Sequence, residues 1–297
     1  MKRVIAVGDV ITDVLAVLTA PLAPGSDASA AIRMTGGGQA ANTAAWLSWS
    51  GVPVTLVAAV GTDEAGNTRL SELAAGGVHC TVRRWADTPT GSIVVLVDGS
   101  ERTMITDRGA SLRIDPGDID AALAAAPDAG HLHLSAYTLL DAASQPAGRH
   151  ALAVARGHGL TTSVDAASAA PLARVGRAAF LTWVRGVDLL LANGDEAAVL
   201  TGAASATAQA EALARWARVA AVVKRGVAGA VWAGVDGPTV EASTPVAAMV
   251  DPTGAGDAFA AGLLAAWLSG AGPAEALAEG VRLGALAVTQ VGARPVR

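Results

Sequence analysis

The sequence predicts an α/β fold: a three-layer αβα sandwich with a mostly parallel central sheet and a small β-sheet lid. Helical segments alternate with short apolar ones along much of the 297-residue chain, which implies parallel strands joined by right-handed crossovers. Apolar residues make up 52% of the chain and charged residues 16%, as expected for strands buried on both faces. Two irregular, strand-rich stretches near 10–35 and 81–107 predict the lid.

The N-terminal part of the chain supplies elements of both predicted sheets. Apolar runs and helical spacing predict a strand at 4–8, a helix at 39–50, a strand at 54–60 and a helix at 64–75. The stretch 10–35 contains Pro21, Pro24 and Gly25, which favour extended structure. Short strands are predicted at 81–85, 92–98 and 103–106. We expect the strands of 10–35 and 81–107 to pair as the lid.

From residue 118 onward, helices and strands alternate regularly. Helices are predicted at 118–126, 142–156, 178–184 and 206–218, and strands at 131–134, 161–164, 187–191 and 220–223. Two helices at 256–269 and 273–289 close the chain. Because no repeat or linker interrupts this order, we expect residues 1–297 to form a single domain into which the two lid segments are inserted.

Polar residues directly follow several predicted strands. Asp9 and Asp13 come after the first strand, and Asp165, Asn193 and Lys224 each follow a later one. Because ligands of open α/β sheets bind outside the carboxyl ends of the strands, this placement predicts a site at that edge. Asp9 is interpreted as a turn-capping residue. Asp165 is interpreted in the same way, with a phosphate contact as the alternative.

Composition excludes several classes of function. The formal net charge of −5 argues against a nucleic-acid partner. Cys80 is the only cysteine, so no intramolecular disulfide is possible, and we expect a reducing, cytoplasmic location. The longest apolar run, 258–268, is far shorter than the ~20 residues that a membrane span needs, so no membrane association is expected.

Residues 251–257, Asp-Pro-Thr-Gly-Ala-Gly-Asp, are the most informative stretch of the chain. They open an apolar helix, and small residues at 254–256 let backbone N–H groups approach a ligand at the positive end of the helix dipole. Thr253 is a candidate cap for this helix. Asp257 is placed to take a proton from a group that attacks a bound phosphate. A glycine-rich helix cap is the simpler alternative; the combination of amides and base favours phosphoryl transfer to a hydroxyl.

This stretch resembles the second signature of the PfkB (ribokinase-like) carbohydrate kinases, D-[ST]-T-G-A-G-D, with Pro252 at the Ser/Thr position. A second cluster, Gly-Gly-Gly-Gln-Ala-Ala-Asn at 36–42, resembles the first signature of the same family. Both lie in the family's order, about 200 residues apart, and the resemblance extends from residue 4 to 293. It implies an ATP-dependent sugar kinase that uses Mg²⁺.

The resemblance also implies roles for individual residues. Asp257 is the catalytic base, and the amides of Gly254, Ala255 and Gly256 stabilise the transferring phosphoryl group. The implied sugar contacts are Asp13, Gly37, Gly38, Asn42 and Arg108. The implied ATP contacts are Asn193, Glu196, Lys224, Gly226, Gly229 and Thr253. Glu196 organises Mg²⁺ through water, and Asp251 lies near a potential K⁺ site. Arg108 contacts a substrate carboxylate or phosphate, or is simply solvated.

The motifs do not identify the sugar, and several substrates stay open as alternatives. The lid segments offer few aromatic residues, which favours a small ribose-like or fructose-like sugar over the adenosine, inosine or pseudouridine of a nucleoside kinase. A 2-keto-3-deoxygluconate kinase is a further alternative, although its usual Arg is replaced here by Asp107. A non-catalytic sugar-binding protein on the same fold is the alternative from another class. An oxidoreductase would need G-x-G-x-x-G after the first strand, and that motif is absent.

A pair of histidines and the edges of the predicted lid lead to two more expectations. His131 and His133 form a His-x-His pattern, but no carboxylate or cysteine lies at ligand spacing, so we expect packed, hydrogen-bonded histidines rather than a metal site. A lid sheet would have unpaired edges, and pairing with a second copy would protect them, so we expect a homodimer through the lid.

Overall fold

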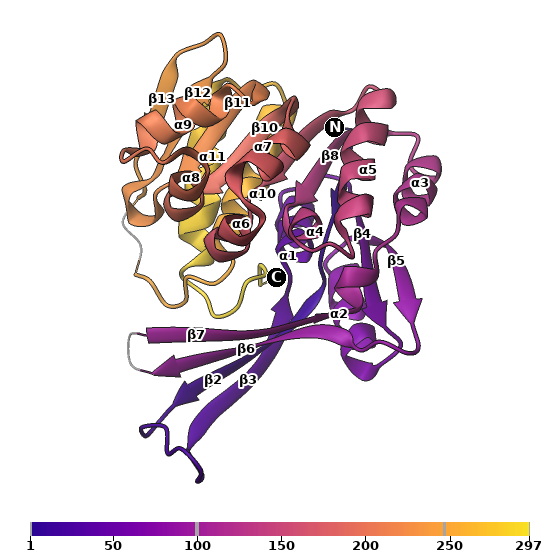
Figure 1. The fold of residues 1–297 in the computed structure, drawn as a ribbon, viewed down its shortest axis with the longest axis vertical. Helices are drawn as coiled ribbons and strands as arrows, with labels where there is room; N and C mark the ends of the chain where they lie inside the picture. The colour runs from indigo at the N-terminus through magenta and orange to yellow at the C-terminus, as the bar shows by residue number, and fades with distance from the viewer. Residues whose placement is uncertain (1, 99–100, 246–247, 297) are drawn as a thin grey trace.

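The computed structural model describes residues 2–98, 101–245 and 248–296, and its strands form two separate sheets (Figure 1). The larger sheet has nine strands in the order β13-β12-β11-β10-β9-β8-β1-β4-β5. Their bounds are β1 (Arg3–Val7), β4 (Val54–Gly61), β5 (His79–Trp85), β8 (Ala129–Ser135), β9 (Thr161–Asp165), β10 (Val187–Asn193), β11 (Ala217–Lys224), β12 (Ala230–Gly234) and β13 (Thr239–Ala242). Neighbouring strands from β5 to β11 are parallel, whereas β12 and β13 pair antiparallel. The mostly parallel central sheet is therefore confirmed.

Helices cover both faces of this sheet, which confirms the three layers (Figure 1). Successive residues of β1 point to opposite faces, so Ile5 and Val7 join one buried cluster while Val4 and Ala6 join the other. The first cluster is covered by α3 (Pro116–Ala125), α4 (Tyr137–Leu140), α5 (Gln145–Gly157), α6 (Ala169–Val175), α7 (Arg177–Val184), α8 (Gly194–Thr201) and α9 (Ala206–Ala214). The second is covered by α1 (Gln39–Trp49), α2 (Glu64–Ala75), α10 (Ala255–Leu268) and α11 (Pro273–Ala287).

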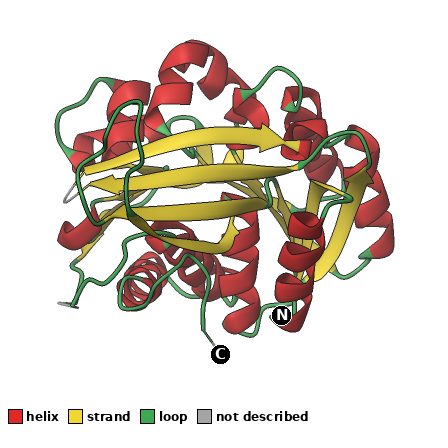
Figure 2. Ribbon diagram, turned by 90° about the horizontal axis from the view of Figure 1, so that it is seen from below, coloured by secondary structure: helices red, strands yellow, loops and turns green. Residues whose placement is uncertain are grey.

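The smaller sheet is the lid; it extends away from the body of the molecule in Figure 1 and lies across the front in Figure 2, which is seen from below. It has the order β3-β2-β6-β7, with bounds β2 (Ile11–Leu18), β3 (Ala30–Gly37), β6 (Thr90–Asp98) and β7 (Glu101–Gly109). The expectation that 81–85 also belongs to the lid is wrong, because β5 pairs with β4 at the edge of the larger sheet. Arg83 and Arg84 are exposed, so the residue pattern of this edge strand is as polar as that of a lid strand.

Other boundaries differ from the expectations for local reasons. The predicted helix at 142–156 is α5, which begins at Gln145 with Pro146 in its first turn; the short helix α4 before it was not predicted. The predicted helix at 178–184 is α7, and Gly176, at φ +87°, separates it from α6, which was not predicted. Helix α8 and the strands β12 and β13 were not predicted either. Within the described residues, no helix has both the length and the apolar character that crossing a membrane requires.

The topology gathers functional groups at one edge of the larger sheet. Strands β1, β8, β9, β10 and β11 all run in the same direction, so their carboxyl ends meet there. Helices α1 and α10 pack against each other, and α1 begins directly after β3 of the lid. The edge thereby brings together strand ends, two helix N-termini and the base of the lid.

Candidate active site

The N-terminus of α10 presents backbone donors without protein acceptors. Its N-cap residue, Gly254, has φ +77°, and among the described residues no side chain caps the helix. The expected cap is wrong: the Thr253 hydroxyl donates instead to Asp251, at 2.6 Å. The N–H of Ala255 donates to the carbonyl of Pro252. Within the described part of the chain, the N–H groups at 254, 256 and 257 have no such acceptor, so they can bind an anion.

Asp257 lies in the first turn of α10 and faces the N-terminal part of α1. The side-chain Nδ2 of Asn42, in α1, donates to its Oδ2 at 2.9 Å, which joins two residues 215 positions apart. Burial raises the pKa of Asp257 to about 8, although the Asn42 hydrogen bond and the Lys224 charge oppose that rise. A carboxylate with such a pKa accepts a proton readily near neutral pH, which suits a general base.

Lys224 brings a positive charge to the same point. It ends β11, and its Nζ lies 3.4 Å from the position that a Cβ on Gly256 would occupy. The Nζ also donates to Oδ2 of Asp165, at the end of β9, over 2.5 Å. Burial lowers the pKa of Lys224, but the carboxylates of Asp165 and Glu196 outweigh burial and hold it above its usual value. The lysine therefore stays charged beside the helix N-terminus, and Asp165 acts as its buried partner.

Asn193 and Glu196 form a reciprocal cap at the start of α8. Asn193 Oδ1 accepts from the Glu196 N–H at 2.9 Å, and Glu196 Oε2 accepts from the Asn193 N–H at 2.8 Å. Burial raises the pKa of Glu196 above its usual range, despite the nearby Lys224. No cluster of three or more His, Cys, Asp or Glu that could hold a metal exists among the described residues. The arrangement fits a Mg²⁺ ion held through water and the nucleotide phosphates better than direct ligation by several side chains.

The predicted sugar contacts converge from the lid and α1. Asp13, on β2, packs so closely on Gly37 that a Cβ at 37 would collide with its carboxylate. Burial raises the pKa of Asp13 to about 6, while the charge of Arg294 opposes that rise. Gly38 has φ +96°, and a Cβ there would lie 2.5 Å from the Asp9 carbonyl oxygen. Both glycines are therefore required where β3 meets α1.

Arg108 is not solvated. Its Nη1 pairs with Oδ2 of Asp9 at 3.2 Å, its guanidinium lies 3.5 Å from the ring centroid of Tyr137, and its side chain is 17% exposed. Asp9 also accepts from the backbone N–H of Ala40, in the first turn of α1, at 3.2 Å. Asp9 therefore bonds to the start of a distant helix and to Arg108 rather than capping its own turn, and the positive charge of Arg108 is partly neutralised before any substrate arrives.

A cavity of about 320 Å³ lies beside Lys224, between the turn after β11 and the last two helices. Gly226 and Gly229, for which the resemblance implies ATP contacts, line it. The remaining lining is largely apolar and includes Phe259, Val281 and Val288. A flat, mostly apolar group such as a purine suits this lining, and Lys224 and Gly256 extend the cavity to the N-terminus of α10.

The two histidines are packed, as expected. His131 bonds to the hydroxyls of Thr161 and Ser163, and His133 bonds to the same Ser163. Burial lowers their pKa values, to about 3 for His131 and about 4 for His133, so both stay neutral.

Sequence reasoning missed Arg294 altogether. Its guanidinium donates to the carbonyl of Gly37 at 2.9 Å and to Oδ1 of Asn42 at 3.3 Å, so it touches two of the predicted sugar contacts. No signature contains it, and arginine is common in this chain. The signal that could have indicated it is the triple glycine at 36–38, which leaves space for a large side chain from elsewhere.

This chain is similar to known kinases both in sequence and in structure. Residues 1–296 match the family described as pfkB family carbohydrate kinase. An ATP-dependent ribose-1-phosphate kinase from Halopiger xanaduensis is 31% identical over 99% of this chain and 94% of its own. A 2-dehydro-3-deoxygluconokinase from Thermoproteus tenax is 31% identical over 84% of this chain and 78% of its own. Among solved structures, adenosine kinase from Sinorhizobium meliloti has a TM-score of 0.87 and 25% identity, covering 100% of this chain and 96% of its own.

Proposed function

The chain belongs to the pfkB family of carbohydrate kinases, phosphotransferases that act on a sugar hydroxyl, and we propose that it transfers the γ-phosphoryl group of ATP to a hydroxyl of a small sugar. One observation supports this most strongly. The carboxylate of Asp257 stands in the first turn of a helix whose N-terminal amides lack protein acceptors, with charged Lys224 beside it. A base and an anion site in one turn are what phosphoryl transfer to an alcohol needs.

In the proposed step, Asp257 accepts the proton of the sugar hydroxyl. The hydroxyl oxygen forms a bond to the γ-phosphorus while the bond from that phosphorus to the bridging oxygen of ATP breaks, and ADP leaves with the electron pair. A sugar hydroxyl is far too weak an acid to ionise at neutral pH, so proton transfer to a base accompanies bond formation. The ionised form of Asp257 is therefore the active one.

The amides of Gly254, Gly256 and Asp257 are proposed to stabilise negative charge on the transferring group. Lys224 adds a full positive charge at the same point. Donors that are already oriented towards the phosphoryl oxygens need no rearrangement during the reaction. Ala255 contributes less than the sequence suggests, because its N–H is engaged by Pro252.

ATP is proposed to place its purine in the cavity beside Gly226 and Gly229 and its phosphates towards Lys224 and Gly256. Thr253 is proposed to act at the nucleotide only through the loop that it braces with Asp251. Asn193 and Glu196 are proposed to hold the Mg²⁺ that accompanies ATP, through water. The metal neutralises phosphate charge in such reactions.

The relatives' names span three kinds of substrate: ribose 1-phosphate, 2-dehydro-3-deoxygluconate and adenosine. We favour a neutral small sugar held by Asp13, Gly37, Gly38 and Asn42. An anionic sugar would need a cation, and the one that the sequence predicts at the sugar, Arg108, is already paired with Asp9.

A nucleoside is the second candidate, and one feature favours it. A cavity of about 350 Å³ lies between the inner face of the lid and the C-terminal loops. It is lined by Leu15, Val17, Ala31, Arg33 and Val97 from the lid and by Val250, Asp251 and Val291 from the C-terminal loops. Leu15 stands two residues beyond Asp13 on the same face of β2, so a base attached to a ribose at Asp13 has an apolar site within reach.

A kinase assay against a substrate panel tests these proposals. ADP release would be measured with ribose, fructose, ribose 1-phosphate, 2-keto-3-deoxygluconate, adenosine, inosine and pseudouridine, with Asp257→Asn as the control. Turnover of a neutral sugar that the variant loses supports the proposal. Preference for a nucleoside supports the second candidate, and preference for an anionic sugar contradicts the neutral-sugar proposal. Tight sugar binding without ADP release would mean a non-catalytic sugar-binding protein.

Three coarser properties of the chain are proposals as well. The chain would act as one kinase unit, with residues 90–109 completing the lid.

A homodimer through the lid is the second of these proposals. Ile32, Met34 and Ile105 are exposed on the lid face opposite Asp13, which supports pairing with a second copy there. A monomer in light scattering would contradict it. Asp251 braces two loops beside α10, and loss of activity on removing K⁺ would support a cation there.

A cytoplasmic location is the remaining proposal from the sequence. It rests on Cys80, which is partly buried and not in a disulfide, with a pKa that burial raises to about 11. Recovery of the protein with periplasmic or extracellular markers on cell fractionation would contradict it.

A further inference from the structure

Residues 291–294, near the end of the chain, contact both α1 and the N-terminus of α10. The indole Nε1 of Trp46, in α1, donates to the carbonyl of Ala293 at 3.0 Å. Gly254, which opens α10, packs on the same residue, and a Cβ at 254 would lie 2.5 Å from the Ala293 carbonyl oxygen. A segment with no signature residue is thus fixed against both halves of the catalytic centre.

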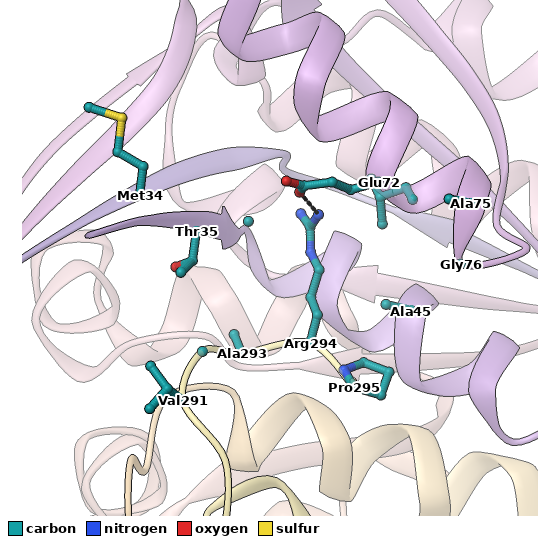
Figure 3. Close-up of a pocket in the computed structure, with 13 residues that line it drawn as sticks. Met34, Thr35, Ala45, Glu72, Ala75, Gly76, Val291, Ala293, Arg294 and Pro295 are labelled. Carbon is teal, nitrogen blue, oxygen red and sulfur yellow. Dashed lines mark hydrogen bonds and ion pairs between the residues drawn. The ribbon is translucent and has the colours of Figure 1, made fainter. Parts of the chain in front are cut away.

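The next residue, Arg294, extends its side chain towards α1, α2 and the base of the lid. This side chain is 13% exposed and uses all three guanidinium nitrogens in hydrogen bonds. Nε donates to Oδ1 of Asn42 at 3.3 Å, Nη2 to the carbonyl of Gly37 at 2.9 Å, and Nη1 to Oε2 of Glu72 at 3.3 Å. Figure 3 shows the arginine rising from the C-terminal segment to Glu72 of α2, in the wall of a cavity of about 400 Å³.

These contacts select one of the two orientations of the Asn42 amide. With Oδ1 towards the guanidinium, Nδ2 points at Asp257 and donates to it at 2.9 Å. The reverse orientation would bring the NH₂ group against the donors of Arg294 and the amide oxygen against a carboxylate oxygen. Both contacts would then be repulsive, because an amide has its donors on one side and its acceptor on the other.

We propose that Arg294 is a positioning residue, which orients the Asn42 amide so that it holds the carboxylate of Asp257 in place for catalysis. The inference rests on the proposed role of Asp257 as base. Arg294 itself touches neither the base nor the N-terminus of α10, so it acts through Asn42. It also fixes the carbonyl of Gly37, next to Asp13.

The packing at 36–38 supports this inference independently of the hydrogen bonds. A Cβ at Gly36 would collide with the guanidinium of Arg294. A Cβ at Gly37 would collide with Asp13, and Gly38 needs its positive φ. A different contact or backbone angle therefore favours glycine at each of the three positions, and the glycine at 36 makes room for Arg294.

Removing Arg294 should change the ionisation of Asp257 in a defined direction. The Asn42 hydrogen bond lowers the pKa of Asp257, whereas burial and the charges of Asp165 and Asp9 raise it, and Lys224 lowers it. When Asn42 is no longer oriented, its contribution weakens and the pKa of Asp257 rises further. The base then ionises at higher pH, and turnover at neutral pH falls.

The test follows the Asp257 carboxyl by ¹³C NMR in protein labelled at aspartate, with the signal assigned through Asp257→Asn. Arg294→Met removes the donors and keeps apolar bulk. We expect the Asp257 titration to move to higher pH, and kcat to fall about tenfold to a hundredfold, as expected for a misplaced catalytic group. Asn42→Ala should give a similar titration shift. The double variant should add little to it, because the two residues act in series.

Arg69→Met is the matched control. Arg69 is also buried and also pairs with Glu72, at 2.9 Å, but it makes no hydrogen bond to Asn42. It should lower the thermal midpoint while leaving the Asp257 titration unchanged. Arg294→Lys covers the case in which Arg294→Met fails to fold: it keeps the charge opposite Glu72 but cannot reach Asn42 and Gly37 together. It should shift the titration in the same direction with a smaller loss of stability.

An Asp257 titration unchanged in Arg294→Met and Arg294→Lys would overturn the inference, as would full additivity with Asn42→Ala. A shift of equal size in Arg69→Met would also overturn it, because the effect would then be general. The carboxyl titration needs no substrate. If the wild type phosphorylates nothing in the panel, the proposed function fails while the contact between Arg294, Asn42 and Asp257 is still tested.

Discussion

The two sides of the site are built differently. On the phosphoryl side, Lys224 and Asp165 stand at the ends of buried parallel strands, and α10 packs its apolar length into the core. On the sugar side, Asp13 and Arg108 come from lid strands that project from the body (Figure 1). The comparison indicates that the proposed phosphoryl site stands on the buried core, whereas the proposed sugar site depends in part on a sheet that projects from it.

The same contrast explains why motifs identify the reaction more readily than the sugar. A short segment can encode a helix N-terminus with its base, because those groups are neighbours in sequence. The proposed sugar pocket is assembled from the lid, α1 and the C-terminal segment, which are far apart in the chain. If the contrast holds, changes on the phosphoryl side should lower kcat, and changes to the lid residues of the sugar side should mainly alter KM for the sugar.

The largest expected effect is that of Asp257→Asn. Loss of the base should lower kcat by roughly 10²–10⁴-fold and leave ATP affinity nearly unchanged. Because burial raises the pKa of Asp257, its contribution to stability is present below its usual value of 3.8 and is lost as pH rises towards about 8. The variant should therefore melt at the same or a higher temperature than the wild type at pH 8. A wild-type kcat would show that Asp257 is not the base.

Lys224→Met should lower kcat by roughly 10²–10³-fold, the usual loss for one donor to a developing anion. The change also leaves the buried Asp165 without its partner, so stability must be separated from catalysis. The matched control is the double variant Lys224→Met with Asp165→Leu, which removes both charges. It should regain stability but not rate. Recovery of rate in the double variant would mean that Lys224 serves only to neutralise Asp165.

The pH dependence should follow the ionisation of Asp257. Its active form is the carboxylate, so kcat/KM should rise with pH up to about 8, by about tenfold per pH unit on the acid side. The measurement is kcat/KM for the preferred sugar in buffers of constant ionic strength. A profile that is flat across this range would place the limiting step elsewhere. Asp13, whose pKa burial raises to about 6, should add a second, lower inflection in the profile for the sugar.

Asp13→Asn gives the smallest expected effect and the sharpest test of the contrast. Loss of a charged acceptor should raise KM for the sugar about tenfold, consistent with hydrogen bonds to charged groups. KM for ATP should stay within twofold of the wild type, because Asp13 belongs to the lid and not to the nucleotide cavity. Asp107→Asn, an exposed change on β7, is the control and should alter neither constant. An equal rise in both KM values would show that the two sides are not independent.

Much of this protein follows from its sequence, and the remainder depends on contacts between distant residues. Regular alternation of helices and apolar strands predicts the sandwich, because strand and helix periods are local properties of the chain. The helix-opening stretch 251–257 likewise predicts an anion site with a base. The placement of 81–85 in the lid was mistaken, since an exposed edge strand and a lid strand have similar residue patterns.

The sequence by itself determined the fold class and the family, and it predicted most residues of the proposed site. Tertiary structure alone decided that Asn42 meets Asp257, that Arg108 is paired with Asp9, and that Arg294 reaches the site from the end of the chain. The physical reason is that periodicity and capping act over a few residues. The orientation of an amide, or the pairing of a buried charge, is fixed by whatever partner the fold brings within about 3 Å.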